Sequence, residues 1–166
     1  DQLAVLASGE FPGKAIAFEG MVPSPAADME HPPEAVQRYD RMNDHALVGE
    51  VTALAVLESD SRVVGGDVII IEVSLIPGGS GLEITGGRGK ILRESIRAAY
   101  NLVSSRSEAL GVPRAVMEQN RVLVHLVHIA EEREGPSAGI AFVVGIVSAA
   151  ARRPVKPALA LTGEVS

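Results

Sequence analysis

The chain has 166 residues, of which 46% are hydrophobic and only 3% aromatic, and its formal net charge is -6. This length suffices for one domain with a sizeable core, and the acidic balance argues against a nucleic-acid partner, which would need clustered basic residues to neutralise phosphates. The sequence has no cysteine, so disulfides, cysteine nucleophiles and zinc–thiolate sites are excluded. No apolar run reaches the roughly 18 residues that cross a membrane, so no membrane partner is expected.

Residues 1–46 are predicted to form an N-terminal segment that is separate from the domain after it. The stretch from Pro23 to Pro33 holds four of the ten prolines. Proline removes backbone donors and blocks regular structure, which favours a surface loop or an insertion here. Residues 47–166 are predicted to be one domain, truncated at its C-terminus because it stops directly after an apolar strand-like segment.

The first half of that domain is rich in strand signals. Residues 47–57 and 67–76 are rich in β-branched side chains, and the second of these runs is apolar enough for the middle of a sheet. A glycine-rich turn separates the second run from the short strand Leu82–Thr85. These three segments predict an antiparallel meander.

The second half mixes helices and strands. Apolar residues at three- and four-residue spacing predict a helix over 90–110, ended by Gly111 and Pro113. A strand is predicted over 121–130 and a last strand over 158–162. Between them, a helix predicted from Pro136 to about Ala151 is apolar on nearly all sides, so we expect it to be buried. The predicted fold class is α+β.

The segment Glu134-Gly-Pro-Ser-Ala-Gly139 carries the strongest chemical signal. Pro136 suits the first turn of a helix, which places Ser137 at the helix start, where free N–H groups and the positive end of the helix dipole favour negative charge. The oxyanion formed when a serine attacks a carbonyl would be stabilised there, and the small Ala138 leaves room for a substrate. A serine at this position more commonly only caps its helix, and that alternative stays open.

The same string matches the nucleophile elbow of α/β-hydrolases, but the rest of the sequence does not. The elbow needs a strand running into the serine and a histidine after it, whereas a charged loop precedes Ser137 and all four histidines lie before it. A lysine of lowered pKa is the other known base for a serine. Lys14, Lys90 and Lys156 are the chain's lysines, and none has a context that favours this role.

The strings EGPSAG and RPVKPALALTGEVS, with an apolar helix between them, resemble the catalytic-serine region of the Lon family of ATP-dependent proteases. The similarity covers residues 47–166, including a strand–turn–strand–helix stretch upstream. It implies the Lon proteolytic-domain fold, with mostly antiparallel strands and a buried helix that starts at the catalytic serine. It also implies that Ser137 is the nucleophile, that Thr162 hydrogen-bonds near a Ser–Lys dyad, and that Gly163 and Glu164 complete the strand-end motif.

The resemblance assigns supporting roles to three residues upstream of the serine. Glu134 takes the place of an acid that shapes the site, where the family more commonly has aspartate. His125 corresponds to one histidine of a His-x-His pair, and Leu123 stands where the other would be. Glu72 matches a glutamate on the central strand. Each of these residues could instead be purely structural, and Thr162 could merely cap a strand end.

The family's catalytic lysine lies in a Gly-Gly-x-Lys segment after Thr-Gly-Glu, and we expect it beyond Ser166. The glycine-rich run before Lys90 is not a phosphate-binding loop, because it lacks the Gly-x4-Gly-Lys-Ser/Thr pattern. The resemblance implies that this chain holds no metal or cofactor, and that ATP and Mg bind a separate AAA+ ATPase domain of the parent protein. The resemblance further implies polypeptide substrates, a homo-hexamer, and the bacterial cytoplasm or mitochondrial matrix.

Two alternatives of other classes stay open. The missing lysine and Leu123 are compatible with a non-catalytic Lon-like module for assembly or partner binding. The helix start at Pro136 is also compatible with an anion-binding domain. The anion-binding alternative predicts phosphate or sulfate binding that survives Ser137→Ala.

Overall fold

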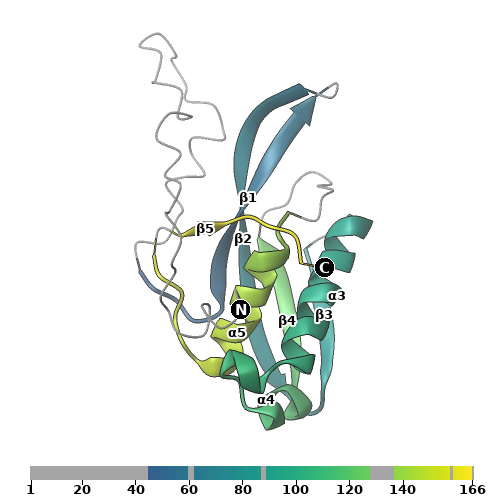
Figure 1. Cartoon of the computed structure of the whole chain (residues 1–166), viewed down its shortest axis with the longest axis vertical. Helices are drawn as coiled ribbons and strands as arrows, with labels where there is room; N and C mark the ends of the chain where they lie inside the picture. The colour runs from purple at the N-terminus through teal and green to yellow at the C-terminus, as the bar shows by residue number, and fades with distance from the viewer. Residues whose placement is uncertain (1–44, 60–61, 87–88, 128–136, 158, 166) are drawn as a thin grey trace.

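The computed structural model describes residues 45–59, 62–86, 89–127, 137–157 and 159–165. These residues form a five-stranded mixed sheet with helices packed against one of its faces (Figure 1). The α+β class predicted from the sequence is therefore confirmed. Most of the predicted N-terminal segment lies outside the described residues, so the division at residue 46 stays a prediction.

Strands β1 (Glu50–Ser59) and β2 (Arg62–Pro77) form a long antiparallel hairpin, one end of which extends past the rest of the sheet in Figure 1. Successive side chains of a strand point to opposite faces of the sheet. On β2, Ile71 and Val73 are buried while Glu72 between them is exposed. The sheet therefore has an inner face, which packs against the helices, and an outer face.

The order of the strands is β3-β4-β2-β1-β5, where β3 is Gly81–Thr85, β4 is Asn120–Val127 and β5 is Ala160–Leu161. The predicted meander is wrong at β3, because β4 takes the place beside β2 and β3 pairs with β4 in parallel. Every second residue of β4 is fully or almost fully buried, which suits an interior strand, whereas β3 is short and suits an edge. β5 pairs in parallel with β1.

The helix predicted over 90–110 is divided. Helix α3 (Lys90–Ser105) buries one apolar face and then ends, and a 3-10 turn (Glu108–Leu110) follows it. Gly111 adopts the left-handed conformation (φ 73°) that commonly ends a helical segment. The short helix α4 (Arg114–Gln119) then leads directly into β4.

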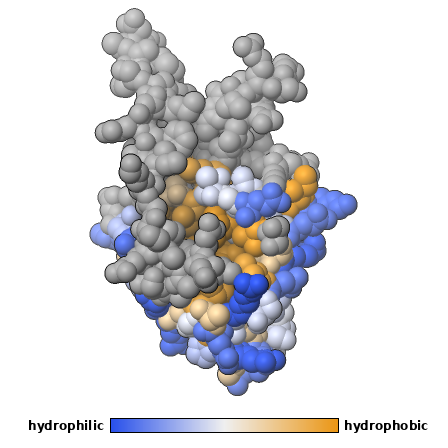
Figure 2. All heavy atoms as spheres, viewed as in Figure 1, coloured by the Kyte–Doolittle hydropathy of each residue, from blue (hydrophilic) through white to orange (hydrophobic). Residues whose placement is uncertain are grey.

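Helix α5 (Gly139–Ala151) lies between α3 and the sheet, in contact with β1 and β2 (Figure 1). Its residues are apolar on nearly all sides, and Phe142 and Ile146 have no exposed surface, as the sequence predicted for a buried helix. Figure 2 shows apolar surface near the centre of this side of the molecule and hydrophilic surface along the α3 side. Burial on several sides fixes the position of α5, and with it the residues at its start.

Candidate active site

Ser137 lies in a turn just before α5, and its side chain is exposed. The sequence predicted that the helix starts at Pro136, but the helix starts at Gly139, with Ala138 as its N-cap. The first helical hydrogen bond runs from the Phe142 N–H to the Ala138 carbonyl at 3.2 Å. The carbonyl of Ser137 is bound by another segment of the chain, so the helical pattern does not extend back to it.

That segment follows β5 and contains the strand-end motif, Thr162-Gly163-Glu164. The N–H of Gly163 donates to the Ser137 carbonyl at 2.5 Å, and the Thr162 hydroxyl donates to the same oxygen at 3.3 Å. In return, the carbonyl of Gly163 accepts from the Ile140 N–H at 3.0 Å. These reciprocal bonds join Ser137 and Ile140 to Thr162 and Gly163. They fix the backbone from the Ser137 carbonyl onward without involving the serine hydroxyl.

The absence of a side chain at Gly139 allows this close approach. A Cβ atom placed on Gly139 would lie 2.8 Å from the backbone nitrogen of Val165 and 3.2 Å from the carbonyl oxygen of Gly163. Real Cβ atoms essentially never come within 3.0 Å of another heavy atom in this way. The glycine two residues after the serine is therefore needed for residues 162–165 to cross the start of α5.

The start of α5 also has backbone donors that are not in use. Among the described residues, the N–H groups of Ala138, Gly139 and Ala141 have no hydrogen-bond acceptor, whereas the Ile140 N–H is taken by Gly163. Unpaired N–H groups at a helix start, together with the helix dipole, favour a negatively charged oxygen. This arrangement can support an oxyanion close to Ser137.

No general base contacts Ser137 among the described residues, because its hydroxyl forms no hydrogen bond with another side chain there. Lys90 lies at the first residue of α3 and Lys156 in the loop before β5, and the side chains of both are exposed. Lys14 lies outside the described residues, as do Glu134 and Pro136. The predicted roles of Glu134 and Pro136 stay predictions.

His125 and Glu72 lie directly opposite each other on β4 and β2, so their side chains share one face of the sheet. This is the outer face, because the neighbouring residues Val73 and Val124 are buried on the inner one. The Nδ1 atom of His125 is 2.8 Å from the Thr85 hydroxyl on β3. Within the described residues no hydrogen bond joins this pair, or Glu72, to Ser137.

Sequence reasoning gave Thr85 no role, although its Thr-Gly pair lies in the stretch that carries the resemblance. The contact between Thr85 and His125 depends on the parallel register of β3 and β4, which places the two residues opposite each other. No local pattern predicts that register.

In the strand-end motif, Glu164 is exposed, whereas Val165, the residue after it, packs against the core.

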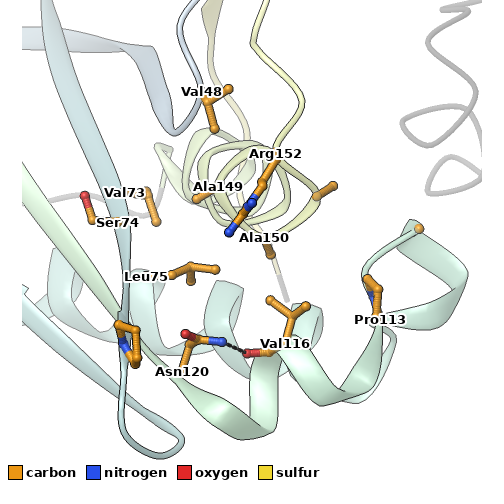
Figure 3. Close-up of a pocket in the computed structure, with 13 residues that line it drawn as sticks. Val48, Val73, Ser74, Leu75, Pro113, Val116, Asn120, Ala149, Ala150 and Arg152 are labelled. Atoms are coloured by element: carbon orange, nitrogen blue, oxygen red, sulfur yellow. Dashed lines mark hydrogen bonds between the residues drawn. The ribbon is translucent and has the colours of Figure 1, made fainter.

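A hollow lies at the other end of α5. It has a volume of about 900 Å³ and lies between the end of α5, the end of β2 and α4 (Figure 3). Ala149 and Ala150 line it from α5, Arg152 lines it from just after that helix, and Val73 and Leu75 line it from β2. Thirteen helical residues span about 20 Å at 1.5 Å per residue, so this hollow is separate from the serine.

Among the described residues, no group of three or more histidine, cysteine, aspartate or glutamate side chains could hold a metal ion. In the same part of the chain, no helix is long and apolar enough to cross a membrane. The fold and the site together define an α+β domain in which an exposed serine precedes a buried helix. The backbone carbonyl of that serine is held by the segment that follows β5.

The sequence of this chain is similar to those of Lon proteases. The family described as the Lon protease (S16) C-terminal proteolytic domain matches residues 30–166. The Lon proteases of Erwinia amylovora, Escherichia coli (strain K12) and Vibrio parahaemolyticus are 41%, 40% and 39% identical to this chain over 133 residues. That alignment covers 79% of this chain but only 16% of each relative. The chain belongs to the Lon proteolytic-domain family.

Proposed function

We propose that this chain is the peptide-cleaving domain of a Lon-type serine endopeptidase, with Ser137 as its nucleophile. The observation that carries the proposal is the contrast between the backbone and the hydroxyl of Ser137. Thr162 and Gly163 hold its carbonyl, whereas its exposed side chain has no partner within the described residues. A nucleophile needs this combination of a fixed position and an accessible oxygen.

The proposed reaction is acyl transfer. The Ser137 oxygen attacks the carbonyl carbon of the scissile peptide, and a base takes the hydroxyl proton. Unused N–H groups at the start of α5, including that of Ala138, stabilise the oxyanion. The proton then passes to the leaving amine, and an acyl-enzyme forms. Water attacks the ester in the same way, which releases the acid and restores the serine.

We propose that the base is a neutral lysine in the Gly-Gly-x-Lys segment that follows Thr-Gly-Glu in the family. Thr162 would orient this lysine, because its hydroxyl already lies beside the Ser137 backbone. The supporting roles of Glu134, His125, Glu72 and Glu164 rest on the resemblance. Thr85 joins them as the hydrogen-bond partner of His125.

The activity of the whole protein goes further than this chain, which spans about one-sixth of the length of the relatives it matches. We propose that an AAA+ domain of the parent protein uses ATP and Mg to deliver unfolded or damaged polypeptides to Ser137. We also propose a homo-hexameric parent in the bacterial cytoplasm or the mitochondrial matrix.

Hydrolysis of a fluorogenic peptide by the parent protein, extended past Ser166, tests the proposal. Ser137→Ala should abolish hydrolysis, whereas the control Ser105→Ala, which alters an exposed serine on α3, should not. Equal cleavage by Ser137→Ala and the unmodified protein would exclude Ser137 as the nucleophile. A folded but inactive extended protein would exclude the peptidase function itself.

A non-catalytic assembly module is the second candidate. Leu123 in place of a family histidine favours it, because the side chain that lies beside His125 on β4 is apolar. The parent sequence shortly after Ser166 discriminates the two, since a Gly-Gly-x-Lys segment supports the peptidase and its absence supports the module.

A further inference from the structure

Among the described residues, strand β3 has a free edge. It is the last strand on its side of the sheet in this part of the chain, where it pairs only with β4. One row of its backbone N–H and C=O groups is therefore unpaired among the described residues. Five residues at 3.3 Å each give an edge of about 17 Å, and such an edge can accept another extended chain.

A groove lies beside this edge, between β3 and α3. Its volume is about 290 Å³. Leu82 and Ile84 supply apolar surface from β3. The other lining residues come from α3 at helical spacing and are polar: Arg93, Arg97, Tyr100 and Asn101.

The polar side of the groove favours a negatively charged ligand. Each of its four side chains can donate hydrogen bonds, and no acidic side chain among the described residues lines the groove. Arg97 is exposed, whereas Arg93 takes part in another interaction, so Arg97 is the groove's cation for an acidic ligand. On the outer face of β3, Glu83 forms an ion pair with Arg121 at 3.2 Å.

We propose that β3 and α3 form a docking groove for an extended polypeptide segment, which adds to the sheet beside β3 and places acidic side chains against Arg97. Backbone hydrogen bonds to a strand edge give affinity in this mode of recognition, and alternate side chains give specificity. The proposal does not depend on the chemistry of Ser137.

The two faces of β3 define the sequence that fits. Side chains of an added strand alternate between the faces. Those on the inner face meet Arg97 and should be acidic. Those on the outer face lie beside Glu83 and Thr85, where a carboxylate would be repelled and a threonine fits well. The groove therefore selects an alternation of acidic and uncharged hydrophilic residues.

A second copy of this chain fits the edge less well. Symmetric pairing of two β3 strands would place both α3 helices on the same side of the joined sheet. Arg97 of one copy would then lie on the same side of the joined sheet as Arg97 of the other, in the groove next to the junction. Like charges in that arrangement repel, so the groove favours an acidic segment.

Fluorescence anisotropy with the full chain tests the proposal. The probe is fluorescein-labelled Thr-Glu-Thr-Glu-Thr-Glu-Thr, and its control has the same composition with the glutamates in one block. The alternating peptide should bind at least about tenfold more tightly than the block peptide. Arg97→Glu should weaken its binding about tenfold, whereas Arg106→Glu, the same charge change beyond the end of α3, should leave it within about twofold.

Two N-methylated versions of the alternating peptide test the backbone pairing. One carries N-methyl groups on its threonines and the other on its glutamates. An added strand donates from every second residue only, so one version should lose binding and the other should keep it.

Four outcomes would overturn the proposal. Equal binding of the alternating and block peptides, or equal weakening by the two arginine variants, would show general electrostatic attraction only. Equal binding of both N-methylated peptides would exclude pairing with β3. Concentration-dependent self-association that Arg97→Glu abolishes, without peptide binding, would assign the edge to a second copy.

Discussion

Ser137, at the start of α5, and Ser148, near its end, have opposite surroundings. Ser148 is 5% exposed, and its hydroxyl accepts from the Gly49 N–H at 2.9 Å and donates to the Arg153 carbonyl at 2.5 Å. Ser137 is exposed, and only its backbone carbonyl is bound. The end of α5 therefore has a serine whose hydroxyl both accepts and donates a hydrogen bond. The turn before α5 has a serine whose hydroxyl is unused within the described residues.

The difference separates a structural serine from a candidate nucleophile. A buried hydroxyl has to be paired, because an unsatisfied one loses about 1–3 kcal/mol of stability. Ser148 meets this requirement by joining the end of α5 to the chain entering β1. Ser137 has no such requirement, and Thr162 and Gly163 position it from the backbone instead.

The largest expected effect is on Ser137. Ser137→Ala should lower peptide hydrolysis by the extended protein roughly 10⁴-fold or more, as removal of a serine nucleophile does elsewhere. The free energy of unfolding of this variant should differ from that of the unmodified protein by less than about 0.5 kcal/mol, because the side chain is exposed. Peptidase assays and urea denaturation measure the two quantities. A large loss of stability would contradict the contrast with Ser148.

The next effect is at the opposite end of α5. Gly49 has φ +79°, and a Cβ there would lie only 2.2 Å from the Val73 carbonyl oxygen. Gly49→Ala should destabilise the fold by about 3 kcal/mol, from backbone strain and steric overlap together. Gly111→Ala is the control, since φ is +73° and nothing lies within 4 Å. The Gly111→Ala variant should lose only about 1 kcal/mol of unfolding free energy. Equal losses for the two variants in denaturation experiments would show that the contact with Val73 does not affect stability.

Ser148→Ala should have a smaller effect on the same property. It leaves the buried N–H of Gly49 without its acceptor, so we expect a loss of about 1–3 kcal/mol. Catalysis per folded molecule should be unchanged, because the change lies about three helical turns from Ser137. The exposed Ser105→Ala is the control for denaturation, with less than about 0.5 kcal/mol expected. Loss of activity at full stability would contradict the structural role.

The smallest effect tests the backbone contact at the start of α5. Gly139→Ala should displace residues 162–165, because its Cβ would overlap the Val165 nitrogen. We expect kcat to fall about tenfold with KM unchanged, since the serine shifts relative to its oxyanion donors. Steady-state kinetics of the extended protein checks this. Unchanged kcat, with α5 intact by circular dichroism, would show that the crossing segment does not position Ser137.

Much of the fold followed from the sequence alone. Apolar periodicity predicted α3, and the nearly uniform apolar run predicted the buried α5, because both patterns reflect burial of local side chains. Runs rich in β-branched residues predicted β1 and β2, although β2 begins five residues before the predicted range 67–76. The strand predicted over 121–130 corresponds to β4, and residues 128–130 lie outside the described residues. The resemblance singled out Ser137, Thr162 and Gly163, which the structure brings together.

Tertiary structure alone decided how these parts meet. The position of β3 beyond β4 depends on pairing between strands far apart in the chain, which a local pattern does not encode. The start of α5 at Gly139 has a similar cause, because Gly163 occupies the carbonyl that an earlier helix start would use. The sequence determined which residues are apolar, small or nucleophilic. Competition between distant backbone groups for the same partners decided where Ser137 lies.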